Sequence, residues 1–511
     1  MKTVYIETLG CQMNVLDSEL VASELQRIDW QLVDAPNGAD AILFNTCSVR
    51  QHAEDKVWSA LGRLKQYPRQ RPDVIIGVLG CMAQREQATI FKRAPHCHFV
   101  IGPGRIGHIA DVFRRVESGE RGIVEVSADR RHTPTAEILA DFEPFNPSRA
   151  PIDPQRLAVA DAVTPPISSS HPNTEADSGL EPRFRTARPN PYQAMVRIQL
   201  GCDNFCTYCI VPYVRGPQQC RAPNEIVEET RQLVNDGVVE VTLIGQTVNA
   251  YRWTAPHATM PGGSSETGSV GLAALLGELQ RVDGLRRIRF LTNYPREMTP
   301  ELIAAVREND KVCPFFHVPA QSGSDRVLRR MNRHYTVAGY REMLDRIREA
   351  IPDASITSDF IVGFCGETNE EFEETARLVR DARFRNSFVF KYSPRPGAKA
   401  AERLADDVPD EVKRRRNHEL LAIQKEISAE DQLAMAGKSV EILVEGISKG
   451  NRRPLGEAGS PGGAVDPVVQ LVGRTVHDQI VVFDGPPSLA GQILPIRIER
   501  AEPFTLFGRT L

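Results

Sequence analysis

The sequence lacks any long hydrophobic run and any excess of basic charge. No apolar stretch approaches the roughly 20 residues that a helix needs to cross a bilayer, and Glu7 interrupts the N-terminal apolar segment that a signal peptide requires. The formal net charge is −4, from 62 Lys and Arg against 66 Asp and Glu, unlike that of a strongly basic nucleic-acid-binding protein. We therefore expect a cytoplasmic protein without a membrane segment.

Cysteine is the residue type that says most about chemistry, because disulfides are rare in a reducing compartment. The chain has 10 cysteines. In a cytoplasmic protein this number indicates metal binding or redox chemistry. The length of 511 residues exceeds what one hydrophobic core organises and predicts about three domains.

Residues 1–120 alternate short apolar runs with helical patterns. The predicted strands are 4–8, 41–45 and 74–79. Strands that alternate with helices are typical of a parallel sheet covered on both faces, so we predict an N-terminal parallel α/β sandwich. Residues 121–190 are a predicted linker or insertion, since eleven prolines lie between Pro134 and Pro191 among few large apolar residues.

The alternation of strands and helices resumes in residues 191–432. The candidate strands are 195–200, 239–244, 287–291, 315–318, 355–363 and 387–392. Six βα units in a row predict a partial (β/α)6 barrel. Residues 433–511 change to period-2 apolar runs with Gly turns, which predict a small β-barrel. Two polar stretches, 256–269 and 450–467, are predicted loop insertions. The chain is thus an α/β multidomain protein by prediction.

The strongest motif is Cys202-x3-Cys206-x2-Cys209, which we call the loop trio and which directly follows the strand predicted at 195–200. Thiolates at this spacing on a tight loop can hold three irons of a [4Fe–4S] cluster. No fourth cysteine is near in sequence, so the fourth iron is expected to be open, as in catalytic metal sites. Zinc is the alternative, but zinc motifs usually come as paired Cys-x2–4-Cys units.

A second set, Cys11, Cys47 and Cys81, is dispersed in the sequence and is called the edge trio here. Each cysteine follows a predicted parallel strand by one to three residues, and ligands of open α/β sheets bind at that edge. Gly10 and Gly80 would let the backbone approach a bulky cluster. Free cysteine is common in cores, but three at one topological position favour a second three-thiolate cluster.

These motifs carry a family resemblance. The loop trio, with Tyr208 before its last cysteine, resembles the radical S-adenosylmethionine (SAM) enzymes. With the edge trio and the β-rich tail, nearly the whole chain resembles the methylthiotransferases of that superfamily, and the tail resembles a TRAM domain. Residues 10–14 (Gly-Cys-Gln-Met-Asn) and 45–50 (Asn-Thr-Cys-Ser-Val-Arg) are similar to the tRNA-2-methylthio-N6-dimethylallyladenosine synthases rather than to the branch that modifies a ribosomal protein.

The resemblance implies SAM and two [4Fe–4S] clusters as cofactors. The loop trio would hold the catalytic cluster, whose open iron binds SAM and yields a radical that takes hydrogen from C2 of an adenine. The edge trio would hold the cluster that supplies sulfur, and a second SAM would supply the methyl group. The implied product is 2-methylthio-N6-isopentenyladenosine at position 37 of tRNA, next to the anticodon.

Further contacts to the cofactor are expected from the same resemblance. The residues concerned are Tyr208, Gly245, Gln246, Ser322, Ser324, Ser358 and Asp359. Gly245 and Gln246 end a predicted strand, where ligands of barrels bind. Structural roles stay open for them, such as an ordinary turn after the strand, or for Ser324 the N-cap of the next helix.

The expected partners are a tRNA anticodon loop, because a base leaves its stack most easily in a single-stranded loop, and a one-electron donor of the flavodoxin or ferredoxin type. We expect a monomer. Residues 433–511 hold eight Lys or Arg against eight Asp or Glu, so RNA binding there needs an uneven charge distribution. Candidate basic residues are Lys449, Arg452, Arg453, Arg474 and the run Lys413–Arg416.

Three alternatives remain at this point. The chain could methylthiolate another tRNA adenosine or a ribosomal protein, it could be a two-cluster electron carrier, or it could be a non-catalytic RNA-binding protein with zinc. Open irons and a barrel-sized pocket serve no purpose in an electron carrier. The sequence also departs from the family pattern, with Gln218 and Cys220 in place of an acidic residue and a serine, and Cys365 in place of a proline.

Overall fold

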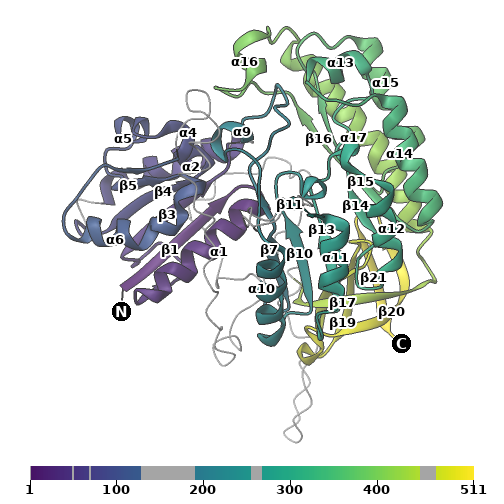
Figure 1. Cartoon of the computed structure of the whole chain (residues 1–511), viewed down its shortest axis with the longest axis horizontal. Coiled ribbons are helices and arrows are strands. Elements are labelled where there is room, and N and C mark those ends of the chain that lie inside the picture. Colours follow the sequence, from purple (N-terminus) through teal and green to yellow (C-terminus); the bar gives the residue numbers. More distant parts are fainter. Residues whose placement is uncertain (1, 49–50, 68–70, 128–189, 255–267, 449–467) are drawn as a thin grey trace, which may run out of the picture.

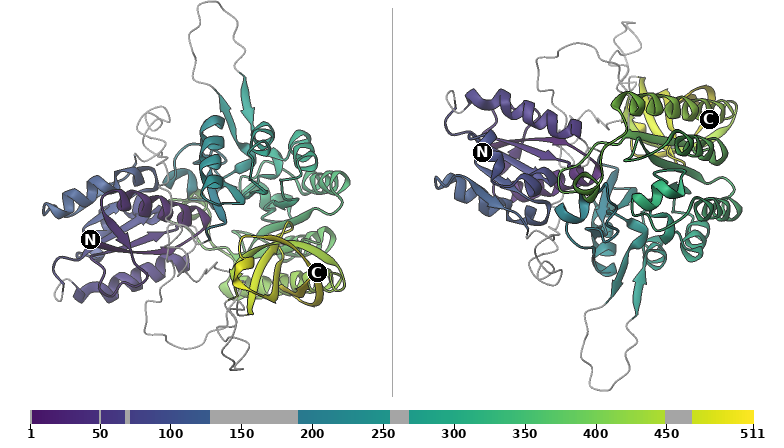
Figure 2. Two further views of the ribbon diagram at one scale, coloured as in Figure 1. Left: turned by 90° about the horizontal axis from the view of Figure 1, so that it is seen from below. Right: turned by 90° about the horizontal axis from the view of Figure 1, so that it is seen from above.

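The computed structural model describes residues 2–48, 51–67, 71–127, 190–254, 268–448 and 468–511. The linker predicted at 121–190 and the loops predicted at 256–269 and 450–467 lie almost entirely outside the described residues. The chain forms an N-terminal sheet with its helices, a central barrel and a small C-terminal barrel (Figure 1). Figure 2 shows from below and from above that the C-terminal barrel packs against the central barrel.

The N-terminal sheet is parallel throughout, as predicted. Its strands, in spatial order, are β2 (Trp30–Leu32), β1 (Lys2–Leu9), β3 (Ala41–Thr46), β4 (Ile75–Gly80), β5 (Phe99–Ile101) and β6 (Ile123–Glu125). Every residue of β3 and β4 is buried, because helices cover both faces of the sheet.

Two hydrophobic cores lie on the two faces of this sheet. Helices α1 (Gln12–Arg27) and α6 (Ile109–Glu117) form one core with side chains such as Leu16 and Phe113. Helices α2 (Gln51–Arg63), α4 (Cys81–Glu86) and α5 (Thr89–Arg93) form the other. The predicted α/β sandwich is confirmed.

The central barrel is built from two parallel three-stranded sheets. One contains β7 (Gln193–Arg197), β10 (Glu240–Ile244) and β13 (Arg287–Phe290), and the other contains β14 (Phe315–His317), β15 (Ser355–Val362) and β16 (Asn386–Lys391). A parallel bridge between Ile288 and Val312 joins the two sheets. Six parallel strands in chain order confirm the predicted partial barrel.

The strand predicted at 195–200 is divided in two, and this division places the loop trio. After β7 the chain turns away from the barrel sheet, and β8 (Gln199–Leu200) pairs with β9 (Gln219–Cys220) in a separate antiparallel ribbon. The loop between these two short strands carries the loop trio. The following helix, α10 (Pro223–Asn235), starts at Pro223 with Ala222 as its N-cap, because proline is already favourable at the first helical position.

The long helix α17 (Asp410–Leu433) leads into the C-terminal domain, which is a closed barrel. Its strands, in spatial order, are β17 (Ser439–Ile447), β18 (Val469–Thr475), β19 (Ile480–Gly485), β21 (Thr505–Thr510) and β20 (Ile493–Glu502). Strand β21 contributes one side chain, that of Leu506, to the core of the barrel.

Two buried arginines fasten this barrel to the central one. Arg287 donates from Nη1 to the carbonyl oxygen of Arg474 at 2.9 Å, and Arg289 donates from Nη2 to that of Thr475 at 2.6 Å. Glu240 lies 3.1 Å from Arg289 and compensates its charge. Among the described residues, no helix is long and apolar enough to cross a membrane.

Candidate active site where the N-terminal sheet meets the barrel

The loop trio lies on a loop that closes on itself. Cys202 donates from its backbone N–H to the carbonyl oxygen of Gly216 at 3.2 Å. Gly201 is required at this closure, because its φ is +79° and a Cβ there would lie 1.9 Å from the carbonyl oxygen of Pro217. Burial raises the pKa of Cys209, and the neighbouring thiols of Cys206 and Cys202 raise it further, so the three thiols converge.

Polar groups from the loop itself and from two other segments surround these thiols. Arg333 donates from Nη1 to Cys206 Sγ at 3.4 Å, and Thr247 Oγ1 lies 3.5 Å from Cys202 Sγ. Asn204 Nδ2 also donates to Cys202 Sγ, at 3.6 Å. The sequence motifs did not indicate Arg333, since it is 127 residues away from Cys206 in the chain.

The barrel next to this loop contains two carboxamides without partners. Gln199 is fully buried, and neither its Nε2 nor its Oε1 has a hydrogen-bond partner among the described residues. Gln246, beyond the end of β10, is half-buried, but the two polar atoms of its carboxamide are buried and also lack partners among the described residues. Gly245 separates the two, because a Cβ there would lie 3.1 Å from Gln199 Cβ. Buried amides without partners are costly, so they indicate a polar ligand in this part of the barrel.

The other residues expected to contact the cofactor divide between two sides of the barrel wall. Asp359 Oδ2 lies 3.4 Å from Nε2 of His317, whereas the hydroxyl of Ser358, the preceding residue on β15, bonds to the Val318 carbonyl oxygen and the Ala320 N–H. Successive residues of a strand point to opposite sides, and Phe360 packs with the helices, so Ser358 faces the helices and Asp359 the barrel interior.

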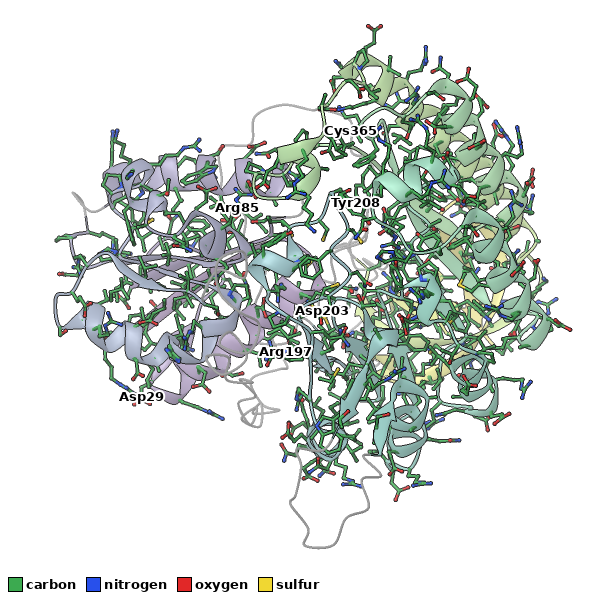
Figure 3. The ribbon with its side chains drawn as sticks, turned by 45° about the horizontal axis from the view of Figure 1, so that its top comes forward. Asp29, Arg85, Arg197, Asp203, Tyr208 and Cys365 are labelled. Carbon is green, nitrogen blue, oxygen red and sulfur yellow. The ribbon has the colours of Figure 1, made fainter. Side chains whose placement is uncertain are left out.

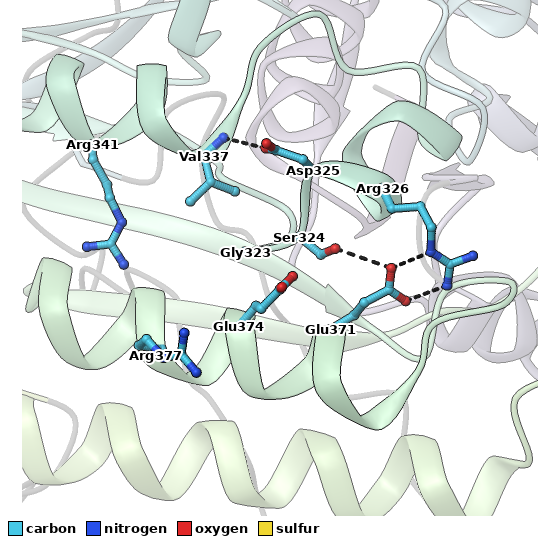
Figure 4. Close-up of a pocket in the computed structure, with 9 residues that line it drawn as sticks. All are labelled: Gly323, Ser324, Asp325, Arg326, Val337, Arg341, Glu371, Glu374 and Arg377. Atoms are coloured by element: carbon cyan, nitrogen blue, oxygen red, sulfur yellow. Dashed lines mark hydrogen bonds and ion pairs between the residues drawn. The ribbon is translucent and has the colours of Figure 1, made fainter.

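Ser322 and Ser324 also bond on the helix side. Ser322 Oγ lies 3.4 Å from Thr375 Oγ1 and Ser324 Oγ donates to Glu371 Oε1 at 3.3 Å, both on helix α15 (Asn369–Ala382). Ser324 is the N-cap of α13 (Asp325–Arg330), but its hydroxyl does not cap the helix. Figure 4 shows Ser324 and Arg326 directed at Glu371 in a polar pocket of about 420 Å³.

Tyr208 lies between the loop trio and a small hydrophobic cluster. Its ring packs against side chains that include Phe364, Cys365 and Tyr392. Burial raises the pKa of Tyr208, while the positive charge of Arg333 opposes the shift. Figure 3 shows Tyr208 in the middle of the molecule, between the N-terminal sheet and the barrel.

The edge trio lies at the carboxyl edge of the N-terminal sheet, as predicted. Cys11 is the N-cap of α1, Cys47 directly follows β3, and Cys81 is the first residue of α4 after β4. A hydrogen bond with Cys47 lowers the pKa of Cys11 to about 6; burial acts in the opposite direction, and Arg215 lowers the pKa further. Cys11 and Cys81 also interact electrostatically, so the three thiols converge.

The glycines beside the edge trio make room for asparagines rather than for a cluster. A Cβ on Gly10 would lie 2.4 Å from Asn14 Oδ1, and one on Gly80, whose φ is +91°, would lie 2.5 Å from Asn45 Oδ1. Asn14 donates from Nδ2 to Asn45 Oδ1 at 3.0 Å and accepts from the Cys11 thiol at 3.3 Å. The glycines therefore permit an asparagine pair that holds α1 and β3 together beneath the thiols.

Two arginines of the barrel domain reach the edge trio. Arg215 donates from Nη2 to Asp17 on α1 at 2.6 Å, and both side chains are buried. Arg395 donates to Gln51 Oε1 at 2.9 Å, and burial lowers its pKa, while Glu54 and Cys47 act in the opposite direction. Neither arginine was predicted, because both lie in loops of another domain.

The thiols and their surroundings fit iron–sulfur clusters. Each trio offers three thiols, and beside Cys47 the buried hydroxyls of Thr46 and Ser48 have no hydrogen-bond partner among the described residues. In the described part of the chain, no group of three His, Cys, Asp or Glu side chains is arranged to hold one metal ion. A [4Fe–4S] cluster does not require such a group, because each thiolate binds a different iron.

The candidate basic surfaces differ from expectation. Arg474 is half-buried and paired with Glu445 and Asp478 at 3.1 Å each, and Lys449, Arg452 and Arg453 lie outside the described residues. In the run 413–416, Lys413 and Arg416 are buried and paired with acidic side chains, while Arg414 and Arg415 are exposed. Half of this run therefore holds the helix in place, and half faces solvent.

Three family models match the chain. They are Uncharacterized protein family UPF0004 over residues 3–102, the Radical SAM superfamily over residues 196–379 and the TRAM domain over residues 466–511. Among solved structures, the radical S-adenosylmethionine methyltransferase TsrM from Kitasatospora setae, with cobalamin and a [4Fe-4S] cluster bound, has a TM-score of 0.50 and 12% identity, covering 78% of this chain and 74% of that one. This likeness concerns the fold alone.

Relatives match along the whole chain. The tRNA-2-methylthio-N(6)-dimethylallyladenosine synthase of Rhodopirellula baltica is 47% identical over 508 residues, which are 99% of this chain and 95% of that protein. The synthase of the same name from Syntrophotalea carbinolica is 38% identical over 502 residues, 98% of this chain and 97% of that protein. The chain therefore belongs to the tRNA-2-methylthio-N(6)-dimethylallyladenosine synthase family of radical SAM methylthiotransferases.

Proposed function

We propose that this enzyme inserts sulfur at C2 of N6-isopentenyladenosine at position 37 of tRNA and methylates that sulfur, using two [4Fe–4S] clusters. The observation that carries the proposal is the contact between the edge trio and the segment that directly follows the loop trio. Helix α9 (Val211–Val214), which follows the loop trio directly, packs with Val214 and the preceding Ile210 against Cys81 of the edge trio. A site for making a radical therefore adjoins a second site of three thiols.

The proposed division of labour assigns one trio to each half of the reaction. Cys202, Cys206 and Cys209 would hold one cluster with an open iron, and the edge trio would hold the other. When bound, the clusters and SAM supply the radical, the sulfur and the methyl group. The hydrogen bond with Cys47 and the charge of Arg215 lower the pKa of Cys11, which favours the thiolate form that binds iron.

The barrel residues would bind and orient the organic ligands. Gln199 and Gln246 each present a carboxamide, and a carboxamide can pair with the N6 and N7 edge of an adenine. Asp359, held by His317, offers a carboxylate oxygen without a partner among the described residues to a ribose or amino group. Tyr208, Gly245 and the backbone around Ser322, Ser324 and Ser358 complete the proposed wall of the SAM site.

The proposed partners are the anticodon loop of a tRNA and a one-electron donor of the flavodoxin or ferredoxin type, and the enzyme is proposed to act as a monomer. A single-stranded loop allows a base to leave its stack at low cost and to enter the barrel. The TRAM domain supports contact with RNA elsewhere on the same molecule.

Two cysteine variants test the division of labour. Cys206→Ala is expected to abolish 5′-deoxyadenosine formation from SAM, whereas Cys47→Ala retains it and stops sulfur insertion. Each variant is compared for iron and sulfide content with the parent, which is expected to bind about eight irons. Equal loss of both activities in folded Cys47→Ala, or zinc in place of iron in the parent, would contradict the proposal.

The substrate is tested by nucleoside mass spectrometry of tRNA from cells that lack this protein. The expected result is loss of 2-methylthio-N6-isopentenyladenosine and accumulation of N6-isopentenyladenosine, with recovery on complementation. An unchanged tRNA profile together with a lost methylthio group on another tRNA adenosine or on a ribosomal protein would assign the enzyme to that substrate instead.

A further inference from the structure

Arg215 lies where the loop of the loop trio meets the edge trio. It directly follows α9, which packs against Cys81, and its neighbour Gly216 closes the loop by accepting the backbone N–H of Cys202. One closed loop therefore carries the loop trio and presents a guanidinium to the edge trio. Its partner Asp17 lies on α1, whose N-cap is Cys11, so Arg215 lies between that helix and the segment that packs against Cys81.

One terminal nitrogen of the Arg215 guanidinium is hydrogen-bonded, and the other is not. Its Nη2 donates to Asp17 at 2.6 Å, in a pair whose side chains are 3% and 0% exposed. Its Nη1 is buried and has no hydrogen-bond acceptor among the described residues. Burying a charged donor without a well-placed acceptor is costly, and the guanidinium also interacts with the Cys81 thiol, so this atom points to a group bound at the edge trio.

Two more buried hydrogen-bond donors, next to Cys47 in the chain, also lack an acceptor. The hydroxyls of Thr46 and Ser48, on either side of Cys47, have no partner among the described residues. A buried guanidinium N–H without an acceptor beside three thiols fits an electron-rich, negatively charged group. The sulfurs of an iron–sulfur cluster have this character, and hydrogen bonds and positive charge near them set the reduction potential.

We propose that Arg215 donates a hydrogen bond through Nη1 to the cluster bound by the edge trio, and that it makes this cluster easier to reduce. Asp17 is the positioning residue that aims the guanidinium. The inference rests on the proposed second cluster. The proposed redox step is a one-electron reduction. The cluster gains an electron from an external donor, and the positive charge of Arg215 offsets the added negative charge.

The test uses the full chain with Cys202, Cys206 and Cys209 all replaced by Ala, so that only the edge trio can hold a cluster. After reconstitution, the midpoint potential is measured by a dithionite titration with redox mediators, followed by the EPR signal of the reduced cluster. In this background Arg215→Gln is expected to make reduction at least tenfold less favourable, a shift of 59 mV or more to negative potential. Arg215→Lys is expected to lie between Gln and the parent.

Arg197 provides the matched control. Its Nη1 lies 3.7 Å from Asp17 Oδ1, so it shares the same buried carboxylate, and Figure 3 shows it at the same junction of sheet and barrel. The residues that act most on its charge are Asp17, Arg221, Arg215 and Glu229, none of them a cysteine. Arg197→Gln is expected to disturb the junction without changing the potential.

Each outcome decides the inference. An unchanged potential in iron-loaded Arg215→Gln overturns it, and so does an equal shift in Arg197→Gln. If Arg215→Gln loses iron, the inference stands when Arg197→Gln keeps its iron and falls when both lose it. A parent that binds no iron when the edge trio alone is present overturns the second cluster itself, which separates failure of the proposed function from failure of this inference.

Discussion

Arg333 donates a hydrogen bond of 3.4 Å from Nη1 to Cys206 Sγ while its guanidinium lies over the ring of Tyr294, 4.5 Å from the centroid. Its Nε also donates to the Tyr335 hydroxyl at 2.9 Å. A planar cation is thus fixed by two aromatic rings and aimed at one thiol of the loop trio. Lysine could supply the charge but not the planar geometry.

We expect Arg333→Gln to slow 5′-deoxyadenosine formation by about tenfold or more, because a hydrogen bond to a charged group contributes ~1.5–3 kcal/mol and 1.4 kcal/mol is a factor of ten. SAM cleavage is measured with dithionite as reductant and normalised to bound iron. Arg296→Gln is the control, since Arg296 is also near Tyr294 but exposed. A normal rate at full iron content in Arg333→Gln would show that this bond has no role in cleavage.

Gln199→Leu is expected to stabilise the SAM-free enzyme while weakening SAM or substrate binding. Leucine removes a buried carboxamide that has no partner among the described residues, and such a group costs ~1–3 kcal/mol. Thermal unfolding and equilibrium binding of SAM and tRNA measure the two effects. Gln424→Leu is the matched control, because the Gln424 amide donates to the Phe384 carbonyl oxygen at 2.7 Å and its loss should destabilise. Lower stability in both variants would contradict a ligand-directed role for Gln199.

Gly80→Ala is expected to prevent the edge trio from binding its proposed cluster. An alanine at φ +91° and ψ −159° is strained by about 1–3 kcal/mol, and its Cβ would also lie 2.6 Å from the Thr46 carbonyl oxygen. Gly119→Ala separates strain from collision, since its φ of +100° is also unfavourable for alanine but no atom lies within 4 Å of the added Cβ. Iron content per chain should fall by about half in Gly80→Ala and stay unchanged in Gly119→Ala. Equal iron content in both would mean that the thiols tolerate a shift of β4.

His98 makes the N-terminal sheet sensitive to acid. Burial lowers the pKa of His98 to about 4, with Arg121 acting in the same direction, and its Nδ1 accepts the Ile76 N–H at 3.0 Å. Between pH 6.5 and about 4 the unfolded chain binds a proton at this residue that the folded chain does not, so stability is lost as pH falls through that window. Urea unfolding at pH 7 and pH 4.5 should show a smaller loss in His98→Asn. Identical losses would place the acid sensitivity elsewhere.

The sequence predicted the parts of the site that follow local rules. Cys11, Cys47 and Cys81 could be brought together in advance because parallel strands end at one edge of a sheet, whatever the details of packing. The orientation of the Ser358 side chain could not be predicted from the sequence. It depends on which side of β15 faces the helices, and a strand buried on both sides has no polar alternation to show it.

Arg215 and Arg333 could not be predicted from the sequence, for another reason. Each acts on thiols that lie far from it in the chain, and an isolated arginine in a loop has no pattern of its own. The run 413–416 was more tractable, because Lys413 and Arg416 are three residues apart on one helix face while Arg414 and Arg415 face away. Helical periodicity would have divided it correctly.

The bonds that fasten the C-terminal barrel use backbone oxygens at Arg474 and Thr475 as acceptors. Every amino acid offers the same carbonyl, so substitutions that keep the path of that hairpin leave these two bonds in place. The surfaces of the domain that face solvent can therefore diverge between species while the attachment persists. Exchange of this domain between relatives should therefore yield chimaeras in which both of these bonds form.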